Sequence, residues 1–457
     1  MSVVNPYESP EPVTEVVTDA VAPESSTGSQ FPLFADPSFY GMTATQFLGA
    51  FNDNLFKQLV LLLAVGGTAV GAAAEAAEAL GKAPVREGPD IQSLAMFLFA
   101  TPFLLFSGFA GYLSERYSKR AVVVACKVAE IGIVLLGMAA FAMWNITGMA
   151  GLLVVLFLMG GHSAFFGPPK WGILPELFAK RDLPQANGIM LMTTFLAIIF
   201  GTALAGVLAD WFGIQRLWLA SAACLLVAVL GTLTSLLIRK LPAASPGLPF
   251  SPAALAVPGE IVALLRKDRQ LLQAMLASCM FWLIGGIVHP SVNSLGIVQF
   301  GMTKGPTSML AACMGVGIAA GCLTAGMLSK SKVNFRLVKI GAWMLVVLLA
   351  ILAIPGEGKW NLLHYPGTAI VLVLLGVFAG FYAVPLQVFL QTRPPESLKG
   401  RTIATTNLAN WIAIVASAGV YFLFDFVVEW LSVPRATVFA LTALLMLPVA
   451  IFYKPRE

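Results

Sequence analysis

Gly41 to Val65 reads GMTATQFLGAFNDNLFKQLVLLLAV, a stretch long and apolar enough to cross a lipid bilayer. Roughly 20 residues, at about 1.5 Å each, span a hydrocarbon core of ~30 Å. One helical face of this stretch carries polar or small residues, namely Gln46, Gly49, Asp53 and Lys57. Asp53 lies roughly 18 Å along the helix axis, near the middle of the membrane. An ionised side chain at that depth is costly unless it faces a protein interior or water, so the rest of the chain must supply that interior.

The whole chain has the composition of an integral membrane protein. Its 457 residues are 58% hydrophobic and 11% charged, and its mean hydropathy is +0.84, whereas soluble domains carry about 25% charged residues. The net charge of +5 is modest and does not by itself indicate a nucleic-acid partner. The five cysteines lie singly within apolar runs, which is typical of buried small side chains rather than disulfides or metal ligands. No cofactor or metal is expected.

Twelve apolar runs are predicted to cross the membrane as helices. They occupy residues 41–65, 91–113, 121–142, 148–167, 187–209, 216–238, 271–297, 306–329, 336–355, 367–390, 402–424 and 432–453. Residues 1–38 contain no Lys or Arg and lack the apolar core of a signal peptide, so they are predicted to be a disordered tail. The longest connection, 239–270, is predicted to be a cytoplasmic linker between a first bundle, 39–238, and a second bundle, 271–453.

Positive charge is concentrated in alternate connections. Of the 28 Lys and Arg residues, 20 lie on the same side as the two termini and six lie on the other side, while Lys57 and Lys127 lie within runs. Because connections rich in Lys and Arg remain in the cytoplasm, both termini are predicted to be cytoplasmic.

The two bundles carry similar short motifs at corresponding positions. Gly-Tyr-Leu-Ser at 111–114 corresponds to Gly-Met-Leu-Ser at 326–329, and Pro169 corresponds to Pro385. The two offsets, 326 − 111 and 385 − 169, are 215 and 216 residues. Near-equal offsets between equivalent helices indicate a duplicated six-helix unit, which places a substrate site between the halves near the midplane.

Residues 111–120, GYLSERYSKR, follow the second run. They resemble the signature G-x-L-[AS]-[DE]-R-x-G-R-[RK] of the major facilitator superfamily, with Ser118 where the family often has glycine. The resemblance implies an all-α integral membrane fold of twelve transmembrane helices in two pseudo-symmetric six-helix bundles. It also implies a gating latch that holds the cytoplasmic side closed without contacting substrate, made of Gly111, Glu115, Arg116 and Arg120.

Three further stretches carry a narrower resemblance. They are QFLGAFNDNLFK at 46–57, HSAFFGPPKWGILPEL at 162–177 and VPLQVFLQTRPPESLKGRTIATTNLANW at 384–411. They resemble the lysophospholipid transporters of that superfamily, including the transporter domain fused to some glycerophospholipid acyltransferases. The resemblance implies a monomeric multi-pass protein of the bacterial inner membrane that moves lysophospholipid, such as lysophosphatidylethanolamine, by alternating access. A separate acyltransferase partner is implied by the resemblance alone.

Asp53 and its neighbours are the leading candidates for substrate binding. Asp53 either lines the central cavity, paired with Lys57 one turn on, or forms a static buried pair that fixes helix packing. Intramembrane ionisable residues favour the functional interpretation. Of the flanking Asn52 and Asn54, one is expected to face the cavity and the other to bond a neighbouring helix. Gln46 lies on the same face as Asp53.

In the superfamily the first, fourth, seventh and tenth helices line the cavity, so the resemblance nominates further residues. These are His162, Ser163, Trp282, His289, Asn293, Tyr382, Gln387 and Gln391, with Asn410 at the cavity edge. His162 is either a proton carrier or a packing residue. Lys170 either meets a phosphate or anchors its helix at the interface. Lys127 and Glu130, three residues apart, are expected to form a structural salt bridge.

Two other functions are weighed against lysophospholipid transport. A proton-coupled superfamily exporter of amphiphilic small molecules would use the same helices and the same Asp53. An acyltransferase would need the pattern H-x-x-x-x-D, but the residues five positions after the three histidines are Gly167, Ser294 and Ala369. No G-x-S-x-G or P-loop pattern occurs either. The chain is therefore predicted to be a transporter and not an enzyme.

Overall fold

The computed structural model describes residues 32–65, 90–179, 182–249, 259–329, 333–395 and 398–453. The long helices in these residues are α1 (Pro37–Ala64), α3 (Gln92–Arg116), α4 (Lys119–Ala142), α5 (Trp144–Gly172), α7 (Leu183–Phe212), α8 (Leu217–Leu236), α10 (Arg269–Ser294), α11 (Lys304–Ser329), α12 (Phe335–Leu352), α13 (His364–Thr392), α14 (Lys399–Trp430) and α15 (Thr437–Phe452). Shorter segments lie between them: η1 (Leu33–Ala35), α6 (Leu174–Leu177), η2 (Ile214–Arg216), α9 (Gly259–Lys267) and η4 (Leu295–Gln299). The long helices correspond one to one with the twelve predicted runs, which confirms the predicted all-α architecture.

Several helices begin at capping residues that the sequence supplies. Asp36 precedes Pro37 and accepts a hydrogen bond from the Ser38 amide at 2.8 Å, which caps α1. Asp268 accepts from the Leu271 amide at 3.1 Å and caps α10. Such caps satisfy amides that have no partner within the helix.

Ten helices in the described residues are long and apolar enough to cross a membrane by length and composition. Two further long helices lie outside this set. α1 has 28 residues, but the polar residues between Gln46 and Gln58 lower its hydropathy. α15 has only 16 residues and begins at Thr437, not at 432 as predicted, because Ser432 has a φ of 53° in the turn after α14.

The segments predicted as tail and linker are partly helical. α1 begins at Pro37, within the predicted tail, and Leu33 before it is buried. Residues 1–31 of that tail lie outside the described residues. In the predicted linker, α9 is an amphipathic helix whose Ile261 and Leu265 are buried, while residues 250–258 lie outside the described residues.

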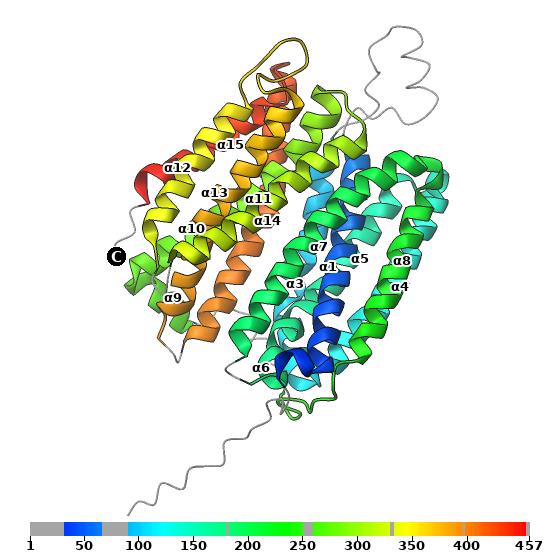
Figure 1. Ribbon diagram of the computed structural model, residues 1–457, viewed down its shortest axis with the longest axis vertical. Helices are drawn as coiled ribbons and strands as arrows, with labels where there is room; N and C mark the ends of the chain where they lie inside the picture. Colours follow the sequence, from blue (N-terminus) through cyan, green and yellow to red (C-terminus); the bar gives the residue numbers. More distant parts are fainter. Residues whose placement is uncertain are drawn as a thin grey trace, which may run out of the picture.

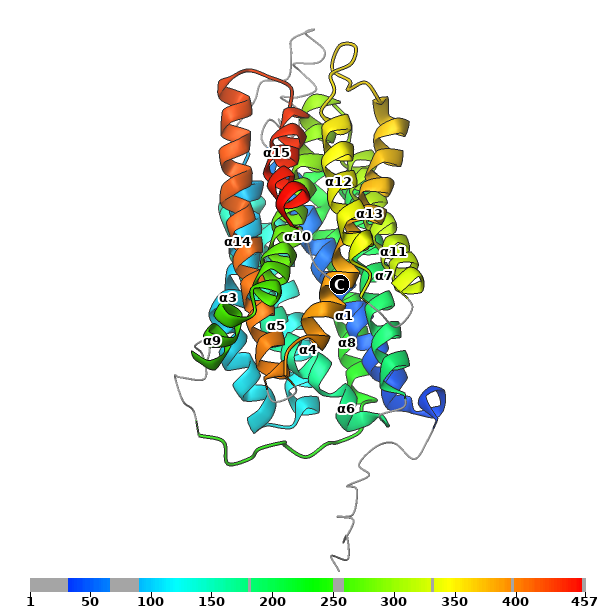
Figure 2. The ribbon, with the colours of Figure 1, turned by 90° about the vertical axis from the view of Figure 1, so that its left-hand side faces the viewer.

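The buried apolar side chains gather separately within the first six and the last six long helices. Two clusters draw only on residues 33–241, and two others draw only on residues 261–453. Figure 1 shows the two groups of helices side by side, and Figure 2 shows the second group toward the viewer. The groups touch mainly where α7 packs against α11 and α3 packs against α14. The space between the two halves is therefore bordered by the α7–α11 contact on one side and the α3–α14 contact on the other.

Glycine allows the closest helix contacts. On α11, a Cβ at Gly321 would lie 2.2 Å from the Val377 carbonyl oxygen of α13. On α13, a Cβ at Gly380 would lie 2.5 Å from the Cys322 amide nitrogen of α11. Small residues let helix backbones approach in this way inside membranes.

Candidate functional site

The polar face of α1 meets α5 at Asp53. The Ser163 hydroxyl of α5 donates to Asp53 Oδ2 at 2.5 Å. Asp53 Oδ1 is buried and has no hydrogen-bond partner among the described residues. A buried carboxylate oxygen is normally satisfied, so this oxygen marks a position for a proton, a water molecule or a polar ligand.

Lys57 lies one turn further along α1, but it does not bind Asp53 as predicted. Its ammonium donates to Asn54 Oδ1 at 2.9 Å and lies 5.2 Å from the centre of the Phe99 ring. Asn54 Nδ2 in turn donates to the Ala50 carbonyl at 2.8 Å. The predicted Asp53–Lys57 ion pair is therefore not formed: Asp53 Oδ2 accepts from Ser163, and the Lys57 ammonium donates to Asn54.

A fully enclosed charge cluster lies behind Asp53. Lys127 and Glu130 of α4 form an ion pair, and their side chains are 1% and 0% exposed. Asn52 Nδ2 of α1 donates to Glu130 Oε1 at 2.7 Å, and His162 Nε2 of α5 lies 3.3 Å from Glu130 Oε2. The predicted Lys127–Glu130 salt bridge is confirmed. Asn52 is thus the residue that faces a neighbouring helix.

His162 connects the enclosed cluster to Asp53. Its Nδ1 lies 2.9 Å from the Met159 carbonyl oxygen and 3.3 Å from the Ser163 hydroxyl. Since Ser163 also donates to Asp53, a chain of polar contacts runs from Glu130 through His162 and Ser163 to Asp53.

Lys170 and Gln46 occupy different environments. Lys170, near the end of α5, is half-buried, with its ammonium 5.0 Å from the Trp171 ring centre and 6.0 Å from that of Phe166. Gln46 is buried and donates to the Thr194 hydroxyl of α7 at 2.7 Å. Gln46 therefore joins two helices of the first half, while Lys170 keeps a cation beside aromatic rings.

The residues nominated in the second half separate into exposed and packed positions. Trp282 of α10 is 44% exposed, and Gln387 of α13 is exposed. Asn410 of α14 is buried and accepts from the Ser278 hydroxyl at 3.1 Å. Tyr382 is buried and donates to the Ala277 carbonyl at 2.8 Å. Asn410 and Tyr382 thus bond α10 to its neighbours.

The residues of the predicted latch contact the linker and α8. Arg116 donates to the Leu248 carbonyl at 3.4 Å, and the Glu115 carbonyl accepts from the Ser245 amide at 2.9 Å. Arg120 Nε donates to the Ile238 carbonyl at 2.6 Å. The Glu115 side chain is exposed, and Gly111 has open space around its Cα.

These latch residues make no hydrogen bond to α10–α15 within the part of the chain that the structure describes.

Hydrogen bonds between the two halves gather at the opposite end of the bundles. Gln58 of α1 donates to Asn293 Oδ1 of α10 at 3.0 Å and to the Ser308 hydroxyl of α11 at 3.2 Å. The side-chain oxygen of Gln58, Oε1, lies 2.9 Å from His289 Nε2. Asn293 Nδ2 donates to Gln92 Oε1 of α3 at 2.9 Å.

Two acidic residues complete this closure. Asp90 accepts from the Gln92 side chain at 3.0 Å and from the Tyr421 hydroxyl of α14 at 3.0 Å. Asp210 of α7 accepts from the amides of Lys304 and Gly305 at 2.9 and 2.6 Å, at the start of α11. These residues lie at the end of the bundles opposite the predicted latch, and we call them the outer seal: Gln58, Asp90, Gln92, Asp210, His289, Asn293, Ser308 and Tyr421.

Of the outer seal, only His289 and Asn293 were predicted from the sequence. Gln58 lies one turn beyond Asn54 on α1 and continues the polar stretch of that helix. This pattern could have identified Gln58 as a further polar contact. Asp90, Gln92 and Asp210 lie at the ends of helices, where polar residues are common, so their pairing across the halves leaves no sequence signal.

Comparison with known proteins agrees with this architecture. The model of the Major Facilitator Superfamily matches residues 59–418. The lysophospholipid transporter LplT of Klebsiella pneumoniae is 30% identical over 403 residues, covering 85% of this chain and 90% of the relative. LplT of an Escherichia coli O6 strain is 30% identical over 386 residues, covering 83% and 86%.

Solved structures share the fold at low sequence identity. A POT family transporter in complex with 5-aminolevulinic acid superposes with a TM-score of 0.68 at 12% identity, covering 94% of this chain and 98% of that one. The transporter FucP in its outward conformation gives a TM-score of 0.58 at 17% identity, covering 91% and 97%. With the family model spanning most of its length and its long helices arranged in the same fold, the chain belongs to the Major Facilitator Superfamily.

Proposed function

We propose that this protein is a secondary transporter that carries lysophospholipid across the bacterial cytoplasmic membrane by alternating access. The charges along α1 and α5 carry the proposal. Asp53 keeps one buried oxygen unpartnered among the described residues, while the ammonium groups of Lys57 and Lys170 lie against aromatic rings. A lysophosphatidylethanolamine headgroup holds one phosphate and one ammonium, which two cations and one carboxylate complement.

The apolar surroundings suit the rest of the lipid. Phe99 and Phe166 lie beside the two lysines, and Trp282 presents an exposed ring on α10. A single acyl chain requires such walls, while its headgroup requires the polar face of α1. The lysophospholipid transporters among the relatives support the same substrate.

The orientation proposed from the Lys and Arg distribution places both termini in the cytoplasm. The outer seal then lies at the periplasmic end. The predicted latch lies at the cytoplasmic end and has no hydrogen bond to the second half among the described residues, and this arrangement fits the inward-facing state of a transport cycle. We further propose net movement of lysophospholipid toward the inner leaflet. There a separate acyltransferase reacylates it, and the transporter works as a monomer.

The test is uptake of labelled lysophosphatidylethanolamine by proteoliposomes that contain the full-length protein. Asp53→Asn keeps the side-chain shape and removes its charge. A hydrogen bond to a charged group contributes about 1.5–3 kcal/mol, so transport is expected to fall roughly 10- to 100-fold. Glu357→Gln makes the same chemical change at an exposed position between α12 and α13 and is expected to leave transport unchanged.

Normal transport by Asp53→Asn would refute the assignment of Asp53. Absent uptake by the unaltered protein would refute lysophospholipid transport. The chain from Glu130 through His162 to Asp53 is the observation that favours the second candidate, a proton-coupled exporter of amphiphilic molecules. Inverted vesicles that expel a cationic dye only under a proton gradient would then support that candidate.

A further inference from the structure

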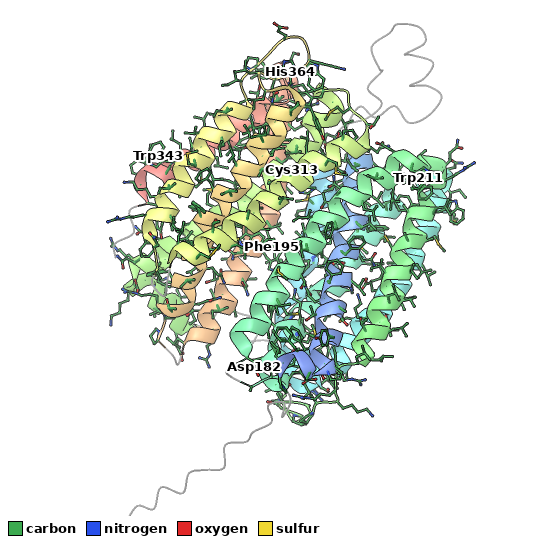
Figure 3. The ribbon with its side chains drawn as sticks, in the orientation of Figure 1. Asp182, Phe195, Trp211, Cys313, Trp343 and His364 are labelled. Atoms are coloured by element: carbon green, nitrogen blue, oxygen red, sulfur yellow. The ribbon has the colours of Figure 1, made fainter. Side chains whose placement is uncertain are left out.

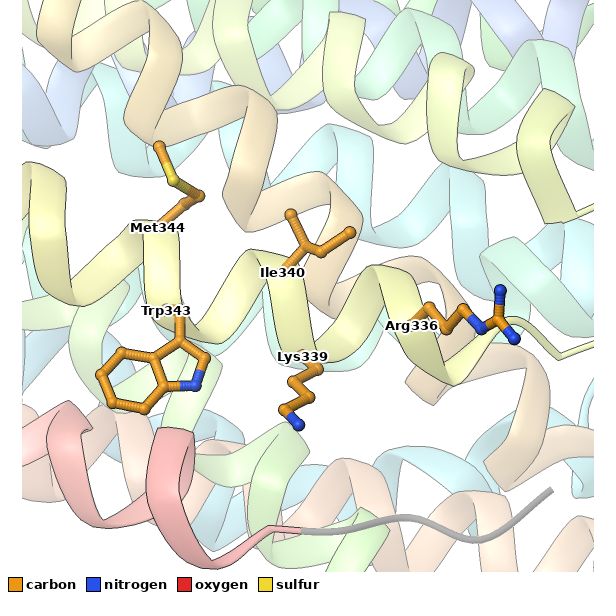
Figure 4. Close-up of a pocket in the computed structure, with 5 residues that line it drawn as sticks. All are labelled: Arg336, Lys339, Ile340, Trp343 and Met344. Atoms are coloured by element: carbon orange, nitrogen blue, oxygen red, sulfur yellow. The ribbon is translucent and has the colours of Figure 1, made fainter.

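The outward face of α12 carries a groove that the transport site does not use. The groove has a volume of roughly 400 Å³ and is lined by Arg336, Lys339, Ile340, Trp343 and Met344. Lys339 and Trp343 project from one side of the helix, toward the side on which α15 is drawn, and Ile340 and Met344 project from the other (Figure 4). Trp343 lies at the lateral edge of the molecule opposite Trp211 (Figure 3). The groove therefore faces the bilayer.

The sequence of α12 produces this face through helical spacing. Phe335, Val338, Ala342, Leu345 and Leu349 are buried in the core of the second half. On the opposite side of the helix, Arg336, Lys339, Ile340 and Trp343 are exposed. Beyond the groove the outward face continues with Val347, which is 43% exposed.

The two cations of the groove lack the partners that other cations at this end possess. Arg393 binds Asp268 at 2.9 Å, and Arg401 binds Glu260 at 2.9 Å. Neither Arg336 nor Lys339 forms an ion pair with any residue that the structure describes. Their positive charge is therefore open to an anion from outside the protein.

The order of side chains along α12 matches the order of chemical groups in a phospholipid. Arg336 and Lys339 lie in the first two turns, where the helix enters the membrane. Trp343 lies roughly 10 Å beyond Arg336 and roughly 6 Å beyond Lys339 along the helix axis, at a rise of about 1.5 Å per residue. Trp rings are enriched at the membrane–water interface, at the level of the headgroups, and the apolar surface that continues to Val347 fits an acyl chain. Basic pockets on the cytoplasmic side of membrane helices bind anionic headgroups.

We propose that the α12 groove binds one anionic phospholipid, with its phosphate on Arg336 and Lys339 and an acyl chain along Ile340, Trp343 and Val347. The leaflet is the one that surrounds the start of α12, which is the cytoplasmic leaflet in the orientation proposed above. This site lies outside the central cavity, so it is independent of the lysophospholipid that the transporter carries.

Quenching of Trp343 fluorescence by brominated lipid tests the proposal. The full-length protein is reconstituted into phosphatidylcholine nanodiscs containing increasing amounts of brominated phosphatidylglycerol. The Trp343 signal is the difference between this protein and its Trp343→Phe variant. Quenching is expected to half-saturate at a far lower mole fraction of brominated phosphatidylglycerol than of brominated phosphatidylcholine.

Charge-removing variants locate the headgroup. Arg336→Gln with Lys339→Gln is expected to weaken phosphatidylglycerol binding roughly 30-fold, which corresponds to about 2 kcal/mol at about 1 kcal/mol per cation. The matched control, Arg266→Gln with Lys267→Gln on the exposed face of α9, is expected to bind like the unaltered protein.

Three outcomes would overturn the proposal. Equal quenching by the two lipids would show no selection for charge, as expected if the groove serves a protein partner instead. Unchanged binding by the Arg336 and Lys339 double variant would remove the headgroup assignment. Displacement of the lipid by glycerophosphate at equal concentration would identify a site for a free phosphate. None of these outcomes depends on lysophospholipid transport.

Discussion

The Glu130 carboxylate is buried inside the first half and is surrounded by polar partners. Its two oxygens face the Lys127 ammonium, the Asn52 amide and the His162 ring. Burying an isolated charge inside a membrane protein costs free energy. A buried ion pair is tolerated only when hydrogen bonds satisfy its remaining lone pairs and N–H groups. The glycines beside it fit this need, since a Cβ at Gly231 would lie 2.9 Å from the Lys127 ammonium.

Glu130→Gln is expected to destabilise the protein by about 3–5 kcal/mol, because it leaves the Lys127 charge buried without a carboxylate. The double variant Lys127→Met with Glu130→Gln should recover part of that loss. Thermal unfolding in detergent measures both. Glu260→Gln breaks the exposed pair with Arg401 and should cost less than about 1 kcal/mol. Equal effects of Glu130→Gln and Glu260→Gln would contradict this account.

At this scale the sequence predicted pairs that are close in the chain. Lys127 and Glu130 are three residues apart, so helical spacing alone brings them together. Asp53 was predicted to pair with Lys57 by the same logic, but its partner is Ser163, which is 110 residues away. Such a contact depends on how α1 and α5 pack, which the sequence pattern does not encode locally.

Among the helices, the contact between α11 and α13 relies most on small residues. A Cβ at Gly317 or Gly321 of α11 would lie 2.0 or 2.2 Å from backbone oxygens of α13. The pairs Gly317/Gly321 and Gly376/Gly380 stand four residues apart on each helix. Backbones can therefore touch along a continuous strip.

Gly321→Val is expected to lower stability by about 1–3 kcal/mol or more, since the added carbons require the two helices to separate. Gly326→Val, on the same helix, is the control because nothing lies within 4 Å of a Cβ there. Both changes are compared by thermal unfolding of the purified protein in detergent. Similar melting temperatures for the two variants would argue against a tight seam.

The positions of the helices follow directly from the apolar runs, since burial of backbone polar groups leaves a helix as the stable form in lipid. Their ends were less predictable. The last run was predicted to begin at residue 432, but Ser432 adopts a positive φ and Arg435 forms an ion pair with Asp425 of α14. A local turn and a charge pair therefore decided where α15 begins.

In the whole molecule, closure at one end depends on residues from both halves. The Asp90 carboxyl is partly buried beside the Tyr421 hydroxyl and near Asp425, which itself pairs with Arg435. Burial, together with the Asp425 charge, raises the pKa of Asp90 to about 6 from 3.8, although hydrogen bonds from Gln92 and Tyr421 oppose the shift. The closed form therefore favours the protonated acid.

The outer seal is expected to weaken as the pH rises. The contribution of Asp90 is fully present below about pH 3.8 and is lost as the pH passes through about 6. Spin labels at the exposed positions Ile146 and Leu362, in a protein without its native cysteines, report the separation of the halves. The short-distance population should fall between about pH 4 and pH 6, and Asp90→Asn should hold it high throughout. A pH-independent distribution in the unaltered protein would contradict the prediction.

The duplication of six helices was readable from matched motifs, but the closed end was not. The bond from Gln58 to Asn293 joins residues 235 positions apart, and it exists only in one relative placement of the two halves. A sequence that supports several relative arrangements of the two halves has no pattern that identifies the contacts of one arrangement.

The Asp210 carboxylate caps a helix that belongs to the opposite half. Whenever the two halves part at that end, α11 loses the acceptor for its first amides, and those two groups become available to water. The rate at which Lys304 and Gly305 exchange their amide hydrogens for solvent deuterium is therefore an intrinsic gauge of how often the molecule opens at that end.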